Sequence, residues 1–185
     1  MSEIILEMQN VEKHFGGVRA IDEFSLKIEK GMTYGLIGPN GAGKTTIFNT
    51  ITGIYHADGG KITFMGKDIT NVEPHKAAEL GIARTFQNIR LFGNLSVKTN
   101  VVIACNLHSK YHLGDALFRT SRYRSATKET EEKAMEFLKI VGLDDKADEL
   151  ASSLPYGHQR KLEIARAMAT DPKLLLLDEP AAGMN

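Results

Sequence analysis

The stretch "GPNGAGKTT", residues 38–46, constrains the fold more than any other feature of this chain. It fits the pattern G-x-x-x-x-G-K-[ST] and lies between a predicted short strand, "MTYGLIG" at 32–38, and a predicted helix, "KTTIFNTITG" at 44–53. Glycines in such a loop permit backbone conformations that turn successive N–H groups inward, and a helix N-terminus adds positive partial charge. This order of elements predicts a phosphate-binding loop in an α/β domain.

The side chains of this loop have separate expected roles. Lys44 can reach the β- and γ-phosphates of a nucleotide, and the Thr45 hydroxyl can ligate Mg²⁺. The loop residues predicted to bind nucleotide are Gly38, Pro39, Asn40, Gly41, Ala42, Gly43, Lys44, Thr45 and Thr46. The alternative is an accidental match, which is expected in roughly one chain in a hundred of this length.

A second segment, "LLLLDE" at 174–179, complements the loop. Its continuous apolar run is typical of a parallel strand that is buried on both faces. Asp178, at the end of this strand, is expected beside the phosphate loop and within the Mg²⁺ shell, and Glu179 is expected to orient or deprotonate a water. A P-loop kinase would not need the second carboxylate. The alternative is two solvated acids that end a strand.

The remaining N-terminal elements predict an antiparallel β region. Strands at 4–15 and 18–30 are joined at two glycines, and a second hairpin at 59–70 has its turn at Gly66 and Lys67. A short helix at 74–80 and a strand at 82–86 follow.

From about 88 to 151 the pattern becomes helical. Helices are predicted at 96–107 and at 127–142, the second with helical spacing of four residues: Ala134, Phe137, Leu138 and Val141. A basic segment, 108–128, separates them. It is either a solvated loop or a contact surface for phospholipid or a partner.

Composition excludes several classes of protein. Lys plus Arg equals Asp plus Glu at 23 each, so no global field attracts nucleic acid or an anionic membrane. The single cysteine, Cys105, cannot form an internal disulfide and fits a reducing compartment. No apolar stretch approaches the roughly 18 residues that a membrane span needs. The chain is therefore expected to be soluble unless a partner holds it at a membrane.

Four segments, taken in order, resemble the Walker A, Q-loop, signature and Walker B/D-loop motifs of an ATP-binding cassette (ABC) ATPase. They are "GPNGAGKTT", "TFQ" at 85–87, "YGHQRKLEIARAMA" and "LLLLDEPAAGMN". "FGGVRAID", "RTFQNIRLF" and "DEPAAGMN" are similar to LivG-type ATP-binding subunits of bacterial branched-chain amino-acid importers. The resemblance implies an α/β fold: a P-loop NTPase core of ABC ATPase type at 1–87 and 152–185, with an antiparallel β region and an inserted α-helical subdomain at 88–151.

The resemblance also assigns roles to residues that mean little alone. Phe15 matches the aromatic that stacks on adenine, although a core Phe in a strand is the alternative. Gln87 matches the Q-loop glutamine, which contacts Mg²⁺ and water, so the implied metal set is Thr45, Gln87 and Asp178 and the catalytic pair is Glu179 and Gln87. Asn185 stands where many relatives have Asp.

The signature segment departs from the widespread L-S-G-G-Q pattern. It comprises Leu154, Pro155, Tyr156, Gly157, His158 and Gln159. In relatives this segment contacts the γ-phosphate of ATP bound to the opposite subunit. Pro155 lacks both a hydroxyl and an N–H, so the Gly157 N–H and the N-terminus of a helix expected from about His158 would bind the anion. The alternative is a structural helix start with no ligand.

The implied function is an ATP-binding and ATP-hydrolysing subunit of an importer, with ATP and Mg²⁺ as cofactors. Its expected partners are a second ATP-binding subunit in a homo- or heterodimer, integral membrane permease subunits and, indirectly, a substrate-binding protein, but no nucleic acid. It would be cytoplasmic and peripheral on the inner face of the cell membrane. Alternatives are another cargo, such as urea or lipopolysaccharide, or a soluble ABC protein outside transport.

Relatives continue past the D-loop through another strand to a switch histidine. None of the six histidines of this chain follows Asp178. The chain is therefore expected to be truncated at its C-terminus, with core strands missing and hydrolysis impaired.

Overall fold

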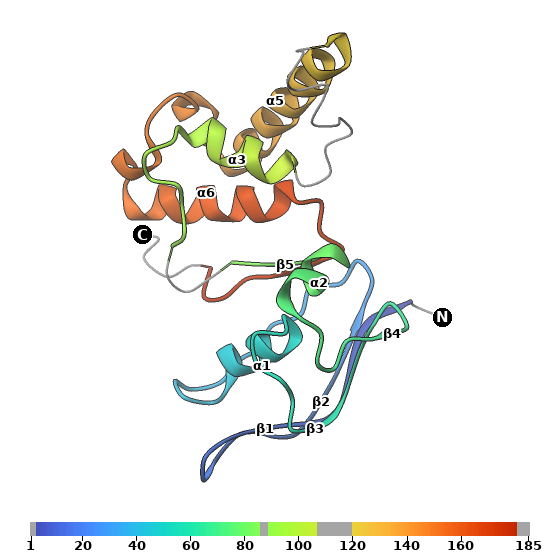
Figure 1. The fold of residues 1–185 in the computed structure, drawn as a ribbon. Helices are drawn as coiled ribbons and strands as arrows, with labels where there is room; N and C mark the ends of the chain where they lie inside the picture. The colour runs from blue at the N-terminus through green and yellow to red at the C-terminus, as the bar shows by residue number, and fades with distance from the viewer. Residues whose placement is uncertain (1–2, 86–88, 107–119, 181–185) are drawn as a thin grey trace. The chain divides into compact units, whose positions relative to one another are not determined.

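The computed structural model describes residues 3–85, 89–106 and 120–180, and the chain divides into two compact units, Met1–Ile82 and Ala83–Asn185 (Figure 1). The first unit combines an antiparallel sheet with two short helices, whereas the second is mostly helical. None of the helices in the described ranges has the length and the apolar content that crossing a membrane requires.

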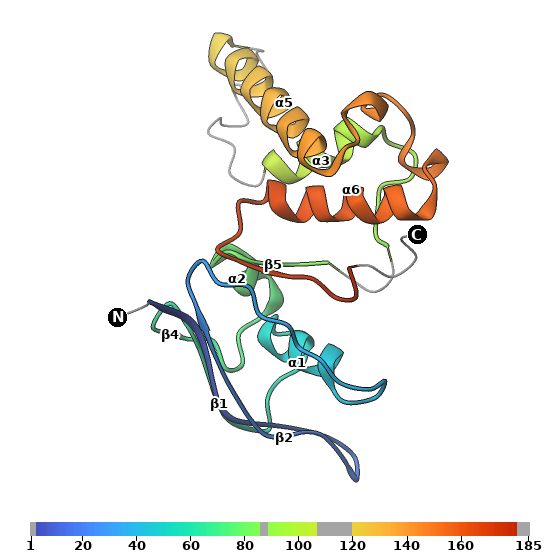
Figure 2. The same cartoon turned by 180° about the vertical axis from the view of Figure 1, so that it is seen from behind.

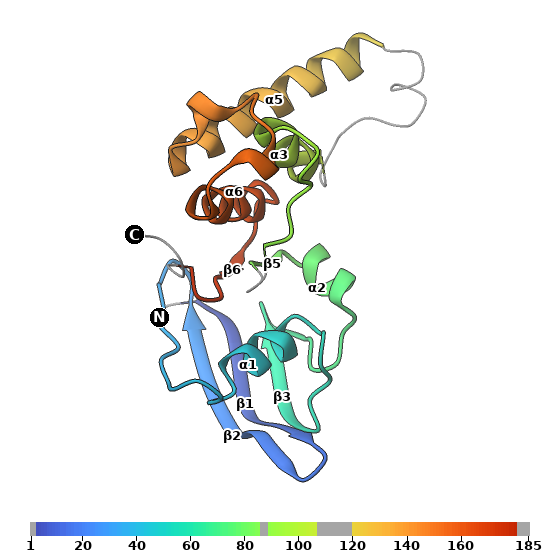
Figure 3. The ribbon, with the colours of Figure 1, turned by 90° about the vertical axis from the view of Figure 1, so that its left-hand side faces the viewer.

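A four-stranded antiparallel sheet forms the centre of the first unit (Figure 3). Its order is β2-β1-β3-β4, with β1 at Ile4–Phe15, β2 at Val18–Glu29, β3 at Gly59–Phe64 and β4 at Lys67–Asp68. Leu6 of β1 pairs with Ile28 on one side and Phe64 on the other, and its side chain is fully buried. The antiparallel pairings of β1 with β2 and of β3 with β4 confirm both predicted hairpins.

The turn of the second hairpin lies one residue earlier than predicted. Phe64 pairs with Lys67, so Met65 and Gly66 form the two-residue loop, with φ of 48° and 76°. Two consecutive positive φ values suit the right-handed twist of the strands. Lys67 belongs to β4. Gly66 in the sequence indicated a turn, but it did not indicate whether Met65 or Lys67 is the other residue of the two-residue loop.

Two short helices complete the first unit. Helix α1, Lys44–Ile51, follows the phosphate loop as predicted and buries Ile47 and Ile51. Helix α2, Pro74–Glu79, begins with a proline, which fits a first helical position because no partner for its missing N–H is needed there.

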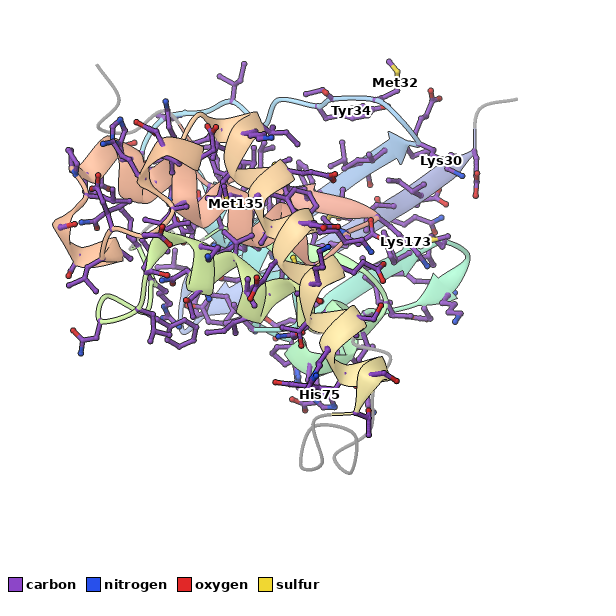
Figure 4. All side chains as sticks on the ribbon, turned by 90° about the horizontal axis from the view of Figure 1, so that it is seen from above. Lys30, Met32, Tyr34, His75, Met135 and Lys173 are labelled. Atoms are coloured by element: carbon purple, nitrogen blue, oxygen red, sulfur yellow. The ribbon has the colours of Figure 1, made fainter. Side chains whose placement is uncertain are left out.

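The predicted strand at 32–38 is wrong. Residues 32–39 adopt no regular secondary structure, and Met32, Tyr34 and Ile37 are 61%, 44% and 95% exposed. In Figure 4 the side chain of Met32 projects outward from the ribbon. An apolar run becomes a strand only when a neighbouring strand accepts and donates its hydrogen bonds. None of the strands in the described ranges pairs with this run.

Three helices pack together in the second unit (Figure 2). They are α3 at Val97–Cys105, α5 at Ser121–Val141 and α6 at Tyr156–Ala169, and two 3₁₀ turns, η2 at Asp144–Lys146 and η3 at Ala151–Ser153, connect the last two. Val101, Leu138 and Leu162, one from each helix, are fully buried in a common core. The helical spacing predicted for α5 is confirmed at Ala134 and Leu138.

Helix α5 begins at Ser121 and not at Thr127. The Thr120 hydroxyl accepts the N–H of Tyr123 at 3.3 Å and so caps the earlier start. The C-terminal part of the predicted basic loop is therefore helical, with Arg124 and Lys128 exposed. The part of that loop at 108–119 lies outside the described residues.

A short two-stranded sheet is formed by the strand that precedes α3 and the strand that follows α6. It pairs β5, Ile82–Arg84, with β6, Leu174–Leu176. Just beyond β5, the N–H of Thr85 donates to the carbonyl of Leu176 at 3.0 Å. Leu174 and Leu176 are buried, which agrees with the prediction of a buried strand before Asp178.

Leu138→Ala is expected to lower the free energy of unfolding of the chain by about 2–5 kcal/mol, because it leaves a cavity among α3, α5 and α6. Urea denaturation followed by circular dichroism measures this loss. Ile140→Ala, on the same helix but 65% exposed, is the matched control and should change stability by less than about 0.5 kcal/mol. Equal losses for the two variants would contradict the packing described.

Candidate nucleotide site

The phosphate loop leads into α1 and has two glycines in the left-handed region. Gly41 and Gly43 have φ of 83° and 82°, and Gly43 is the N-cap of α1. A Cβ on Gly43 would lie 2.3 Å from the carbonyl oxygen of Ala20 in β2, so only glycine fits. The first N–H groups of α1 have no partner within the helix and add positive partial charge at this loop.

Lys44, the first residue of α1, folds back over the loop. Its Nζ donates to the carbonyl of Gly38 at 2.7 Å and to that of Pro39 at 2.8 Å. The ammonium therefore lies beside the loop, where a phosphate would offer it a charged acceptor in place of these neutral carbonyls. Thr45, next along the helix, is exposed, as a residue that ligates an incoming metal must be.

Phe15, at the end of β1, is 44% exposed. Tyr55 packs edge-on against it, with ring centroids 5.1 Å apart and an interplanar angle of 74°. Lys13 Nζ lies 5.5 Å from the centroid of the same ring. Phe15 is thus supported by two neighbours and still offers exposed surface, which stacking on a base requires and a core residue would not show.

Asp58 fixes the strand end that carries Phe15. Its carboxylate accepts the backbone N–H of His14 at 2.6 Å and the Lys13 ammonium at 3.0 Å. These two bonds, first the backbone N–H and then the lysine, hold the pKa of Asp58 below its ordinary value. The carboxylate is therefore ionised at neutral pH and anchors both residues that precede Phe15.

In the second unit, Asp178 follows β6 and is only 4% exposed. Arg84 Nη2, from β5, donates to Asp178 Oδ2 at 2.9 Å, and both side chains are almost fully buried. The N–H of Asp178 donates to the Thr85 hydroxyl at 3.2 Å. The predicted metal ligand is thus held at a strand end by an arginine that the sequence motifs did not indicate.

The side chains predicted to hold Mg²⁺ carry oxygen donors of the type that this ion takes. Magnesium takes hard oxygen donors and is commonly held by one or two carboxylates plus substrate phosphates. Thr45 and Asp178 supply a hydroxyl and a carboxylate of that kind, while one oxygen of Asp178 already accepts from Arg84. Among the residues that the structure describes, no group of three or more His, Cys, Asp or Glu side chains could hold a metal unaided.

Glu179 is exposed and has a φ of 47°, in the left-handed region that side-chain-bearing residues seldom adopt. Arg160 of α6 donates to the carbonyls of Asp178 and, at 3.4 Å, of Glu179. The main chain that carries both carboxylates is therefore bonded to α6. The third predicted site residue of this group, Gln87, lies outside the described residues.

Helix α6 begins at Tyr156, two residues before the predicted start at His158. Pro155 is its N-cap, and the Pro155 carbonyl accepts the N–H groups of His158 and Gln159 at 2.9 and 3.0 Å. A helix start needs no N–H on its cap residue, so the proline is compatible with the first turn. The N–H groups of Tyr156 and Gly157 precede any intrahelical bond and make this end a generic anion site.

The side chains of Gln159, Tyr156 and His158 in the signature segment differ in hydrogen bonding and exposure. Gln159 Nε2 donates to the carbonyl of Leu154, a buried residue, at 2.8 Å. Tyr156 is 51% exposed, whereas Nδ1 of His158 is buried and has no hydrogen-bond partner within the described part of the chain. Gln159 is therefore occupied in holding the loop, and Tyr156 is exposed to solvent.

The predicted site residues belong to two different units of the chain. Phe15 and the phosphate loop belong to the first, whereas Asp178, Glu179 and the start of α6 belong to the second. Sequence reasoning missed Arg84 and Arg160. For Arg160, the oppositely charged Glu163 three residues later was a weak signal of an ion pair. No local pattern indicated that Arg160 is buried.

Known proteins resemble this chain over most of its length. A family model for ABC transporters matches residues 21–182. BraF of Pseudomonas aeruginosa, described as a high-affinity branched-chain amino acid transport ATP-binding protein, is 44% identical over 185 residues, which are all of this chain and 72% of that protein. LivG of Archaeoglobus fulgidus, a probable branched-chain amino acid transport ATP-binding protein, is 43% identical over 98% of this chain and 69% of its own length.

Solved structures agree at the level of the fold. The ADP conformation of MJ1267, an ATP-binding cassette of an ABC transporter, is 36% identical, with a TM-score of 0.80 over 98% of this chain and 71% of that chain. The dimeric MJ0796 cassette is 23% identical, with a TM-score of 0.82 over 98% of this chain and 76% of that chain, and so supports the fold alone. As expected from the resemblance, these proteins are longer than this chain. With its phosphate loop, its Asp178–Glu179 pair and this match over most of its length, the chain belongs to the ABC transporter family and has the ABC ATPase fold.

Proposed function

We propose that this chain is the ATP-binding subunit of an ABC importer for branched-chain amino acids. The observation that carries the proposal is the identity of more than 40% with BraF and LivG relatives over essentially the whole chain. An ATP-binding subunit does not contact the cargo, so the cargo is inferred from these relatives and the nucleotide chemistry from the residues of the chain.

Nucleotide binding is assigned to the first unit. The loop N–H groups and the Lys44 ammonium bind the phosphates, and Phe15 stacks on adenine. Lys44 supports this assignment because its two hydrogen bonds already keep the charge at the loop. The charge need not be brought from solvent when ATP arrives, which reduces the ordering cost of binding.

Hydrolysis is assigned to the strand end in the second unit. Glu179 orients or deprotonates the attacking water, and Gln87 assists it. Thr45, Asp178 and Gln87 would hold Mg²⁺, which when bound neutralises charge on the phosphate oxygens. Asp178 is suited to this role because a buried strand end and Arg84 already fix its carboxylate.

Assembly is part of the same proposal. Two ATP-binding subunits, identical or different, would place the signature segment Leu154–Gln159 of one against the ATP of the other, with the N–H groups of Tyr156 and Gly157 facing its γ-phosphate. The dimer would act on integral membrane permease subunits and, through them, on a substrate-binding protein. This chain would then lie at the inner face of the cell membrane, in the cytoplasm.

Lys44→Ala is expected to weaken ATP binding about tenfold to a hundredfold, because one charge-assisted contact to phosphate contributes about 1.5–3 kcal/mol. Isothermal titration calorimetry with MgATP measures the change. Lys61→Ala removes a lysine of the first unit that pairs with Asp68 at 3.7 Å on the surface, and it should leave the affinity unaltered. Tight ATP binding by the Lys44 variant would contradict the role of the loop.

Glu179→Gln is expected to keep ATP affinity and to lower phosphate release by about 100-fold or more, the usual contribution of a general base. The amide retains the shape of the side chain but cannot accept a proton. Single-turnover phosphate release with excess protein detects even slow hydrolysis, and light scattering should show more dimer with ATP. Glu149→Gln, which changes an exposed acid, is the control and should leave phosphate release unchanged. Unchanged phosphate release by the Glu179→Gln variant would contradict the role assigned to Glu179.

The cargo is tested by co-expressing the chain with its membrane subunits and the binding protein. Uptake of radiolabelled leucine into vesicles should require ATP and should be abolished by Lys44→Ala, since only the nucleotide step differs. Urea serves as the competing cargo. ATP-dependent urea uptake without leucine uptake would assign the chain to another importer.

A further inference from the structure

Arg160 joins helix α6 to the turn that carries Glu179. We infer that Arg160 is a positioning residue: its guanidinium fixes the main chain on both sides of Glu179 and so sets the direction of that carboxylate. The inference rests on the proposed function, in which Glu179 acts on the water that attacks ATP.

Arg160 is buried to a degree unusual for an arginine. Its side chain is 1% exposed, and Nη1 donates to Glu163 Oε2, one turn later in α6, at 2.5 Å. Glu163 is itself only 5% exposed. A buried guanidinium is stable only when carboxylate and carbonyl oxygens surround it. Glu163 therefore holds the charge in place and leaves the other edge of the guanidinium to face the strand end.

The other edge contacts the two peptide groups that flank the Cα of Glu179. Nη2 donates to the carbonyl of Asp178, in the peptide before this Cα, and at 3.4 Å to the carbonyl of Glu179, in the peptide after it. The orientation of these two peptides defines φ and ψ, and φ and ψ define where Cβ points. One guanidinium thus constrains both torsions of the residue that bears the carboxylate.

The constrained conformation is one that Glu179 would not choose alone. Its φ of 47° places a side-chain-bearing residue in the left-handed region, which is uncommon and persists where the surroundings hold it. Pro180 follows and has no N–H with which to bond the main chain to a neighbour. Arg160 instead bonds this part of the main chain to α6 by donating to the carbonyls of Asp178 and Glu179.

Asp178, the residue before Glu179, is held by a second set of contacts, which come from β5 and the residue after it. Asp178 is fixed through its N–H to the Thr85 hydroxyl and through its carboxylate to Arg84. The strand end is therefore held from β5, and the turn after it is held from α6. Because Arg160 lies one turn beyond Tyr156, the helix that presents the signature N–H groups also orients the hydrolytic carboxylate of its own chain.

The test compares Arg160→Met with the wild-type chain. Methionine keeps the apolar stem but donates no hydrogen bond, so Glu179 should lose its fixed direction. Single-turnover phosphate release is expected to fall about 100-fold, the scale of a small misplacement of a reacting group. MgATP affinity should stay within about twofold, because the loop that binds phosphate is untouched. Arg160→Lys keeps the charge but not the planar fork and should give an intermediate rate.

Arg166→Met is the matched control on the same helix. Arg166 donates to the carbonyl of Arg90 and lies 4.9 Å from the ring centroid of Phe92. Its loss should reduce thermal stability without a selective loss of phosphate release. Hydrogen exchange supplies a readout that needs no ATP: the amide of Asp178 should exchange about tenfold faster in Arg160→Met and not in Arg166→Met.

A folded Arg160→Met chain with wild-type phosphate release and wild-type exchange at Asp178 would overturn the inference. If that variant does not unfold cooperatively, Arg160→Lys decides the matter, and wild-type rate and exchange in it would be equally contrary. Absence of phosphate release by the wild type above the Lys44→Ala background would instead reject the hydrolytic function. Exchange at Asp178 would still show whether Arg160 holds the turn.

Discussion

The second unit depends on a buried charge pair between the two ends of its chain path. Arg84 at the end of β5 and Asp178 just after β6 lie 94 residues apart in the sequence and 2.9 Å apart in space. Removing one member of such a pair leaves an unpaired buried charge, at a cost of about 3–5 kcal/mol. The packed helices α3, α5 and α6 lie between these two residues in the sequence, so the ion pair joins the two ends of the segment that contains them. The contact that closes the unit therefore also places the proposed metal ligand.

Much of the fold and half of the candidate site could be predicted from local patterns. The β1–β2 hairpin, α1 after the phosphate loop, and the buried face of α5 each have a periodicity or a glycine signal within a few residues. The loop residues Gly38–Thr46 could be predicted as phosphate-binding for the same reason, since their pattern encodes a local backbone shape. Errors at the borders were small: α6 begins at Tyr156 because a proline cap starts the helix earlier than a glycine would suggest.

The failures concern interactions between distant residues. The run at 32–38 has the composition of a strand, but composition does not show whether another strand is available to pair with it. Arg84 and Arg160 look like ordinary surface residues in the sequence, and only the fold reveals that each is buried against the strand end after β6. Their roles depend on partners that are distant in the sequence, and no single-sequence pattern carries that information.

The exposed run after β2 has a consequence for the behaviour of the chain in solution. Met32, Tyr34 and Ile37 expose apolar side chains on a run that pairs with none of the strands in the described residues, and exposed apolar surface favours association with another molecule. The formal net charge of zero at pH 7 supplies no repulsion between molecules. Polar substitutions in this run would therefore be expected to raise the solubility of the chain without changing the residues proposed to bind nucleotide.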